Sequence, residues 1–122
     1  MSVAIERAAW SGYFKGYNER NETRPTRLEI FGDLGAQPVE HNLPFSGITL
    51  EESRHDAPQL QIMLGHDTSA DMGHLTHTVT DVIRITPKEA ADGSDEALEI
   101  EDAAGNRTLL CFTGETNFLP TT

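Results

Sequence analysis

Histidine is the residue of this sequence best suited to chemistry, because a neutral imidazole binds metal ions and titrates near neutral pH. The chain has 122 residues and five histidines. Two of them, His66 and His74, bracket a segment that also holds Asp67 and Asp71. If the sequences on either side pair as a hairpin, these four side chains can converge on one divalent transition metal ion. The segment therefore predicts a metal site.

A loop without metal is the competing interpretation of the same segment, and we prefer it. The ligand spacing matches no established zinc signature, and Gly65 and Gly73 predict a flexible loop. Strict alternation along a strand places His77, just after this loop, on the face of Leu75 and Val79. That pattern favours a hydrogen-bonded core histidine over a catalytic base.

Other catalytic signatures are absent from the sequence. It has no nucleophile elbow, no Ser-x-x-Lys, no phosphate-binding glycine loop and no dinucleotide fingerprint. The single cysteine, Cys111, lies among Leu109, Leu110 and Phe112, which predicts a buried, unreactive thiol. We therefore expect a non-enzymatic protein that needs no cofactor.

A helix is the first of the elements that must position these residues, and it is predicted over about residues 5–18. Its evidence is an aromatic stripe at i, i+3, i+4 and i+7, formed by Trp10, Tyr13, Phe14 and Tyr17. Stripes of this kind usually face a core, and ligand stacking is the alternative. From Thr26 the period changes to two, which predicts six to eight short strands within residues 26–113.

Two details refine the predicted strands. Pro44 and the pair Ser46-Gly47 break the extended segments 38–43 and 45–50, which predicts an edge strand or a sharply bent strand, because proline cannot donate a hydrogen bond to a ladder. The clearest hairpin joins residues 97–102 to 107–112, and the second of these strands is apolar on both faces, as central strands are. Residues 114–122 are predicted to be a partly mobile tail.

The predicted fold class is α+β and mostly β. A short N-terminal helix packs on a small, mainly antiparallel β-barrel or strongly curved sheet, in a single domain spanning residues 1–122.

Charge limits the partners that the chain can have. Nine Lys and Arg residues stand against 20 Asp and Glu residues, for a net charge of −11. Residues 89–102 hold seven carboxylates and no cation, which would repel phosphates, so we expect no nucleic acid and no membrane partner. Residues 7–27 are locally basic, and their complementarity to residues 89–102 predicts a homodimer.

The lone cysteine and a start unlike a secretory signal predict a cytoplasmic protein.

Several segments together resemble a known family. They are Trp10 with Tyr13 and Phe14, then 34–37 (LGAQ), 43–48 (LPFSGI), 74–79 (HLTHTV) and 96–101 (EALEIE). The pattern is similar to that of small uncharacterised bacterial proteins with a domain of unknown function, the DUF5335-like proteins, over nearly the whole chain. The resemblance implies a single-domain bacterial protein and supplies no activity. Because His74 and His77 lie in a matching segment, they are the first residues to test.

Taken together, the sequence favours a non-enzymatic acidic β-barrel module that binds a protein partner or another copy of itself. One alternative is a metal-binding protein or small metal-dependent enzyme that uses the segment from His66 to His77. The other is a binder of a small apolar ligand held between the aromatic helix and the sheet.

Overall fold

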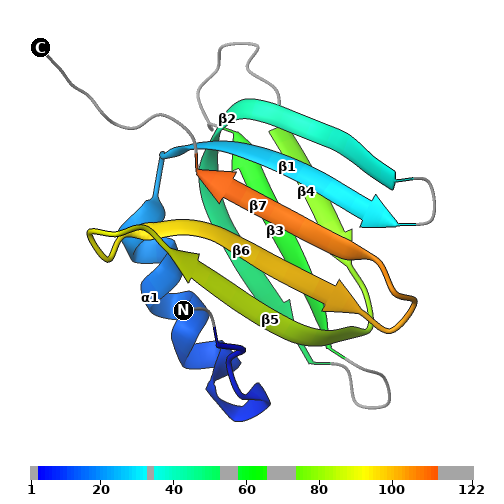
Figure 1. The fold of residues 1–122 in the computed structure, drawn as a ribbon. Coiled ribbons are helices and arrows are strands. Elements are labelled where there is room, and N and C mark those ends of the chain that lie inside the picture. The colour runs from blue at the N-terminus through cyan, green and yellow to red at the C-terminus, as the bar shows by residue number, and fades with distance from the viewer. Residues whose placement is uncertain (1–2, 33–34, 53–57, 66–73, 113–122) are drawn as a thin grey trace, which may run out of the picture.

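The computed structural model describes residues 3–32, 35–52, 58–65 and 74–112 (Figure 1). In this part of the chain a 3-10 turn, Arg7–Ala9, precedes one α-helix and seven strands. They are α1 (Trp10–Asn21), β1 (Pro25–Gly32), β2 (Gly35–Glu51), β3 (Gln59–Gly65), β4 (His74–Val79), β5 (Val82–Glu89), β6 (Asp95–Asp102) and β7 (Arg107–Phe112). The predicted sheet-dominated α+β class is confirmed, and the predicted tail lies outside the described residues.

The aromatic stripe of α1 packs into the core. Trp10, Phe14 and Tyr17 are buried, and Tyr13 is partly buried against them. The α-helix starts later and ends later than the predicted 5–18. Its last turn extends to Asn21, whose buried side chain makes polar contacts with β6. Tertiary contacts, which the periodicity of the helix does not reveal, therefore set its end.

The seven strands form one sheet in the order β4-β3-β2-β1-β7-β6-β5, and every neighbouring pair is antiparallel. The edge strands β4 and β5 do not pair with each other in the described residues, so the predicted closed barrel is not formed there. Only Thr80 and Asp81 separate these edges along the chain, and they must therefore meet at that turn. The sheet accordingly curls, and α1 (blue) lies at one side of the curl in Figure 1.

Strand β2 joins the two halves of this curl. Its residues 35–44 pair with β1, and residues 45–51 pair with β3. Pro44 lies where the partner changes, and β2 runs through it as one strand, so the two predicted extended segments are joined there. Beyond this point no described strand pairs with the edge of β2 that faces away from β3, and α1 lies there instead.

The buried apolar side chains form one core cluster to which α1 and all seven described strands contribute. β7 lies between β1 and β6, as its two apolar faces predicted. Among the described residues, no helix combines the length and the hydropathy needed to cross a membrane.

Candidate functional site

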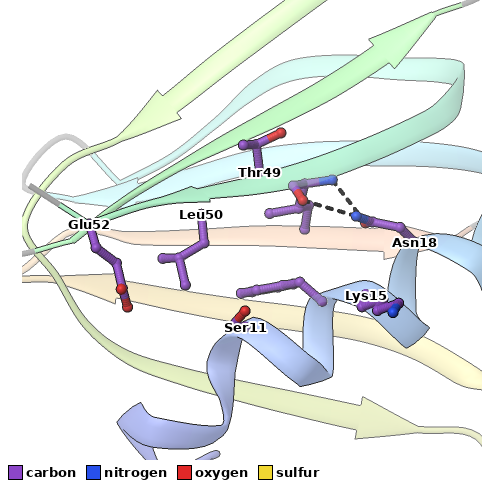
Figure 2. Close-up of a pocket in the computed structure, with 8 residues that line it drawn as sticks. Ser11, Lys15, Asn18, Thr49, Leu50 and Glu52 are labelled. Carbon is purple, nitrogen blue, oxygen red and sulfur yellow. Dashed lines mark hydrogen bonds between the residues drawn. The ribbon is translucent and has the colours of Figure 1, made fainter.

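A groove of about 360 Å³ opens between α1 and β2 (Figure 2). The helix contributes one wall and the strand, with the residue that follows it, contributes the other. The lining residues are Ser11, Phe14, Lys15 and Asn18 from α1, and Ile48, Thr49, Leu50 and Glu52 from β2 and its end.

The side chain of Asn18 fixes the distance between the two walls. Its Nδ2 donates to the Ile48 carbonyl at 3.0 Å, and its Oδ1 accepts from the Ile48 amide at 2.9 Å (Figure 2). The amide side chain thus makes with Ile48 the pair of hydrogen bonds that a neighbouring strand would make. Because both groups of Asn18 are used, the wall is held in one position.

The groove has an apolar floor and a polar rim. Phe14 and Ile48 are buried and Leu50 is partly buried, so the floor presents packed hydrocarbon. On the rim, Ser11 and Thr49 are exposed hydroxyl-bearing residues. This combination suits a ligand that has both an apolar body and hydrogen-bonding groups.

The two charged residues of the lining differ in their partners. The Glu52 carboxylate lies 2.6 Å from Nη1 of Arg7, so its charge is already matched. Lys15 is exposed, and none of the ion pairs among the described residues includes it. Lys15 is therefore the lining charge free to meet a ligand.

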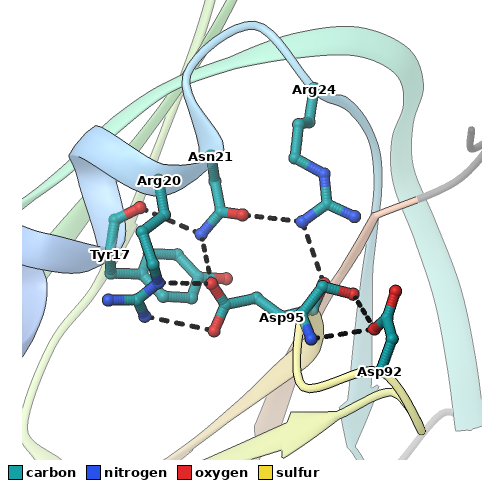
Figure 3. A network of polar contacts seen from close by, with 7 residues as sticks. Tyr17, Arg20, Asn21, Arg24, Asp92 and Asp95 are labelled. Carbon is teal, nitrogen blue, oxygen red and sulfur yellow. Dashed lines mark hydrogen bonds and ion pairs between the residues drawn. The ribbon is translucent and has the colours of Figure 1, made fainter.

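A second polar cluster ties the C-terminal end of α1 to the start of β6 (Figure 3). Arg20 donates to both carboxylate oxygens of Asp95, from Nε at 2.9 Å and from Nη2 at 3.2 Å. Asn21 donates to the same carboxylate at 2.9 Å, and Arg24 donates to the Asp95 carbonyl at 3.0 Å and to Asn21 Oδ1 at 2.7 Å. The basic and acidic stretches that predicted a homodimer thus contact each other within one chain.

The environment of Asp95 stabilises its charged form. Burial by itself raises the pKa of this carboxyl, but hydrogen bonds from Arg20 and Asn21 and the charges of Arg20 and Arg24 outweigh burial, so the pKa lies below its usual value. The site is a charged anchor for the helix, because a general acid or base would need a pKa nearer to neutrality.

Two tyrosines beside this anchor have buried hydroxyl groups without a hydrogen-bond partner among the described residues, Tyr13 and Tyr17. Burial raises the pKa of Tyr13 to about 12, and the nearby Asp95 carboxylate adds to the effect. Burial also raises the pKa of Tyr17 well above its usual value. Both phenols stay protonated at neutral pH, so neither is a base or a nucleophile.

The predicted metal site falls largely on a part of the chain that the structure does not describe. His66, Asp67 and Asp71 lie outside the described residues. His74 begins β4, where its backbone pairs with that of Gly65. Within the described ranges no group of three or more His, Cys, Asp or Glu side chains could hold a metal ion. The site therefore stays a prediction.

His77 lies in the middle of β4, directly opposite Ile62 of β3. It is half-buried, and burial lowers the pKa of its imidazole. No hydrogen bond from its side chain to another described residue is present, so the predicted core hydrogen bond stays a prediction.

Cys111 is half-buried, so the predicted full burial is wrong; in the sheet it lies on β7 between Arg27 of β1 and Ala97 of β6. Nη2 of Arg27 is 3.9 Å from its Sγ. Burial nevertheless raises the pKa of the thiol, so its reactive thiolate form is disfavoured at neutral pH.

Reasoning from the sequence missed the groove and the anchor. Asn18 lies directly after the aromatic stripe, where the predicted helix ends. Its spacing from Phe14 and Lys15 does place all three near one helix face, which is the signal that could have identified the wall. Asp95 was one of seven carboxylates in a solvated-looking run, and nothing local distinguishes it.

Comparison with known proteins places the chain in a family without giving it an activity. A family model described as a family of unknown function, DUF5335, matches residues 1–120. No curated protein and no solved structure matches the chain. The match covers almost the full length, as the resemblance of its segments predicted, and the chain therefore belongs to the DUF5335 family.

Proposed function

We propose that this protein is a non-enzymatic binding module that holds a segment of a partner protein in the groove between α1 and β2. The observation that carries the proposal is the groove itself, in which a packed apolar floor meets a polar rim on two rigid walls. Its exposed rim residues leave it accessible along its length. An accessible groove suits a chain segment better than a small molecule, which usually binds where most of its surface is enclosed.

The alternative of a small apolar ligand between the aromatic helix and the sheet is less well supported. Tyr17 packs edge-on against Phe45 of β2, with ring centroids 5.6 Å apart, and it also contacts Phe112 of β7. The stripe thus uses its aromatic surface on the protein's own core. A second copy of the chain remains one form that the partner segment can take.

The test is selection from a random peptide display library, followed by affinity measurement with synthetic copies of the enriched peptides. A Ser11→Trp variant fills the groove from its exposed rim, and Glu19→Trp places the same bulk at an exposed position of α1 outside the lining. We expect Ser11→Trp to abolish binding and Glu19→Trp to retain it. Equal affinity in both variants, or no enriched peptide, would overturn the proposal.

A further inference from the structure

We infer that the bound segment is an extended strand that pairs with the backbone of Leu50 and places an acidic side chain against Lys15. The inference rests on the proposed function, and it specifies the chemistry of the partner: an extended polypeptide with a carboxylate beside its backbone contact.

The first step is the direction of the backbone groups along β2. Ile48 and Leu50 lie directly opposite Ile62 and Leu60 of β3, with no register shift between them. Because the amide and carbonyl of Ile48 bond to Asn18, they point away from β3. In an antiparallel ladder the direction alternates with each residue, so the amide and carbonyl of Leu50 point to the same side, into the groove.

Other groups of the same chain already bond to part of this edge of β2. Phe45 exchanges backbone hydrogen bonds with Thr23 and Arg24, which lead from α1 into β1. Ile48 is covered by Asn18. Among the described residues no turn, loop or side chain bonds to the backbone of Leu50. The edge therefore offers one open donor and acceptor pair next to a pair that a side chain already fills, and unpaired strand edges are templates for an added strand.

The third step is charge. Of the two charged lining residues, Glu52 is matched by Arg7 and Lys15 has no ion pair among the described residues. A carboxylate on the segment would complement Lys15. Salt screens this short-range attraction less than it screens the repulsion between the segment and the more distant acidic residues of the chain. From Ile48 to Glu52 the strand rises about 13 Å, which spans about four residues of a partner.

The backbone pairing is tested with two substitutions at one position. Leu50→Ala keeps the amide that should donate to the partner, and Leu50→Pro removes it. Proline is tolerated here because this N–H is not part of the β3 ladder and the position lies on a free edge. With an enriched peptide, we expect Leu50→Pro to weaken binding at least tenfold relative to Leu50→Ala, at similar melting temperatures. Equal affinities would overturn the pairing.

A second measurement keeps the pairing testable if Leu50→Pro fails to fold. Amide hydrogen exchange of the unmodified protein is followed by NMR with and without the peptide. We expect exchange of the Leu50 amide to slow on binding by at least tenfold, and that of exposed Ala104 in the β6–β7 turn to stay unchanged. Unchanged exchange at Leu50 with the peptide bound would overturn the inference.

The charge is tested with Lys15→Gln, and Lys88→Gln is the matched control, since Lys88 is an exposed lysine on β5 outside the groove lining. We expect Lys15→Gln to weaken binding several-fold and to reduce its salt dependence, with no change in Lys88→Gln. Replacing the peptide's acidic residue by its amide should cost nothing further in Lys15→Gln. If Ser11→Trp abolishes binding while Lys15→Gln and Leu50→Pro do not affect it, the inference fails and the proposed function stands.

Discussion

Asp95 is the residue on which the polar contacts of the helix converge. Its side chain is 7% exposed, and two arginines, Arg20 and Arg24, contact this residue. Burying a carboxylate is costly unless every partner is present. Here Arg20 and Asn21 supply three donor contacts, so the arrangement stabilises the attachment of α1 only as a complete set.

Asp95→Ala is therefore expected to lower the free energy of unfolding by roughly 2 to 4 kcal/mol, because it removes the carboxylate that accepts from Arg20 and from the buried Asn21. The exposed neighbour Glu96 provides the control, and Glu96→Ala should change stability by less than about 0.5 kcal/mol. Urea unfolding of both variants measures the difference.

The stability that Asp95 contributes should also depend on pH. Its folded pKa lies below its unfolded value, so the contribution is complete above about pH 4 and is lost as pH falls through the folded pKa. An acid-independent difference between Asp95→Ala and the unmodified protein would contradict the anchor.

His77 should make stability depend on pH in a higher range. Burial lowers the pKa of this imidazole in the folded protein, so the unfolded chain binds a proton first as the pH falls. Its contribution is complete above about pH 6.5 and decreases below that value. We expect unfolding free energies measured between neutral and mildly acidic pH to fall less steeply in His77→Gln. Identical slopes would show that the imidazole titrates as freely in the folded state as in the unfolded one.

The helix α1 is held by packing more than by its own propensity. Trp10 is 2% exposed, and its indole N–H donates to the Ile5 carbonyl at 2.9 Å. Trp10→Ala should lower the free energy of unfolding by about 3 to 5 kcal/mol through loss of contacts and the cavity left behind. Ser11→Ala at the neighbouring exposed position should be nearly neutral. Thermal and urea unfolding would contradict a structural role for the stripe if both variants were equally stable.

Two glycines within α1, Gly12 and Gly16, are positions where a substitution should stabilise the helix. A Cβ at Gly12 would meet no atom within 4 Å, whereas a Cβ at Gly16 would lie 3.1 Å from Nη1 of Arg20. Gly12→Ala should therefore stabilise the protein by up to about 1 kcal/mol through helix propensity. Gly16→Ala should gain less, because the guanidinium that anchors Asp95 has to move. A larger gain at Gly16 than at Gly12, measured by urea unfolding, would contradict this account.

The elements were predictable from the sequence to different degrees. The helix and the final hairpin follow from short-range periodicity, and both are present. The two extended segments predicted on either side of Pro44 belong to one strand, because β2 exchanges β1 for β3 at that point and continues. A local pattern shows that proline lacks a donor, but it does not show which strand lies beside it.

At the level of the whole molecule, the order of the strands in the sheet could not be predicted from the sequence. Alternation identifies which residues share a face, but it does not show that β1 lies beside β7, whose residues are about 80 positions away. The groove lies where β1 stops pairing with β2 and α1 takes its place, which alternation does not show either. The anchor likewise joins Arg20 to a carboxylate 75 residues away.

The intramolecular anchor changes what self-association of this acidic chain should look like. Each copy carries a net charge of −11, and Arg20 and Arg24 are already engaged within the chain. Two copies therefore repel through their overall charge, and added salt screens this repulsion. We expect the predicted homodimer to become more populated as salt is raised, measured by sedimentation across protein concentration. A dimer that dissociates on adding salt would show that charge pairs between copies hold it, and a monomer under all conditions would contradict the homodimer.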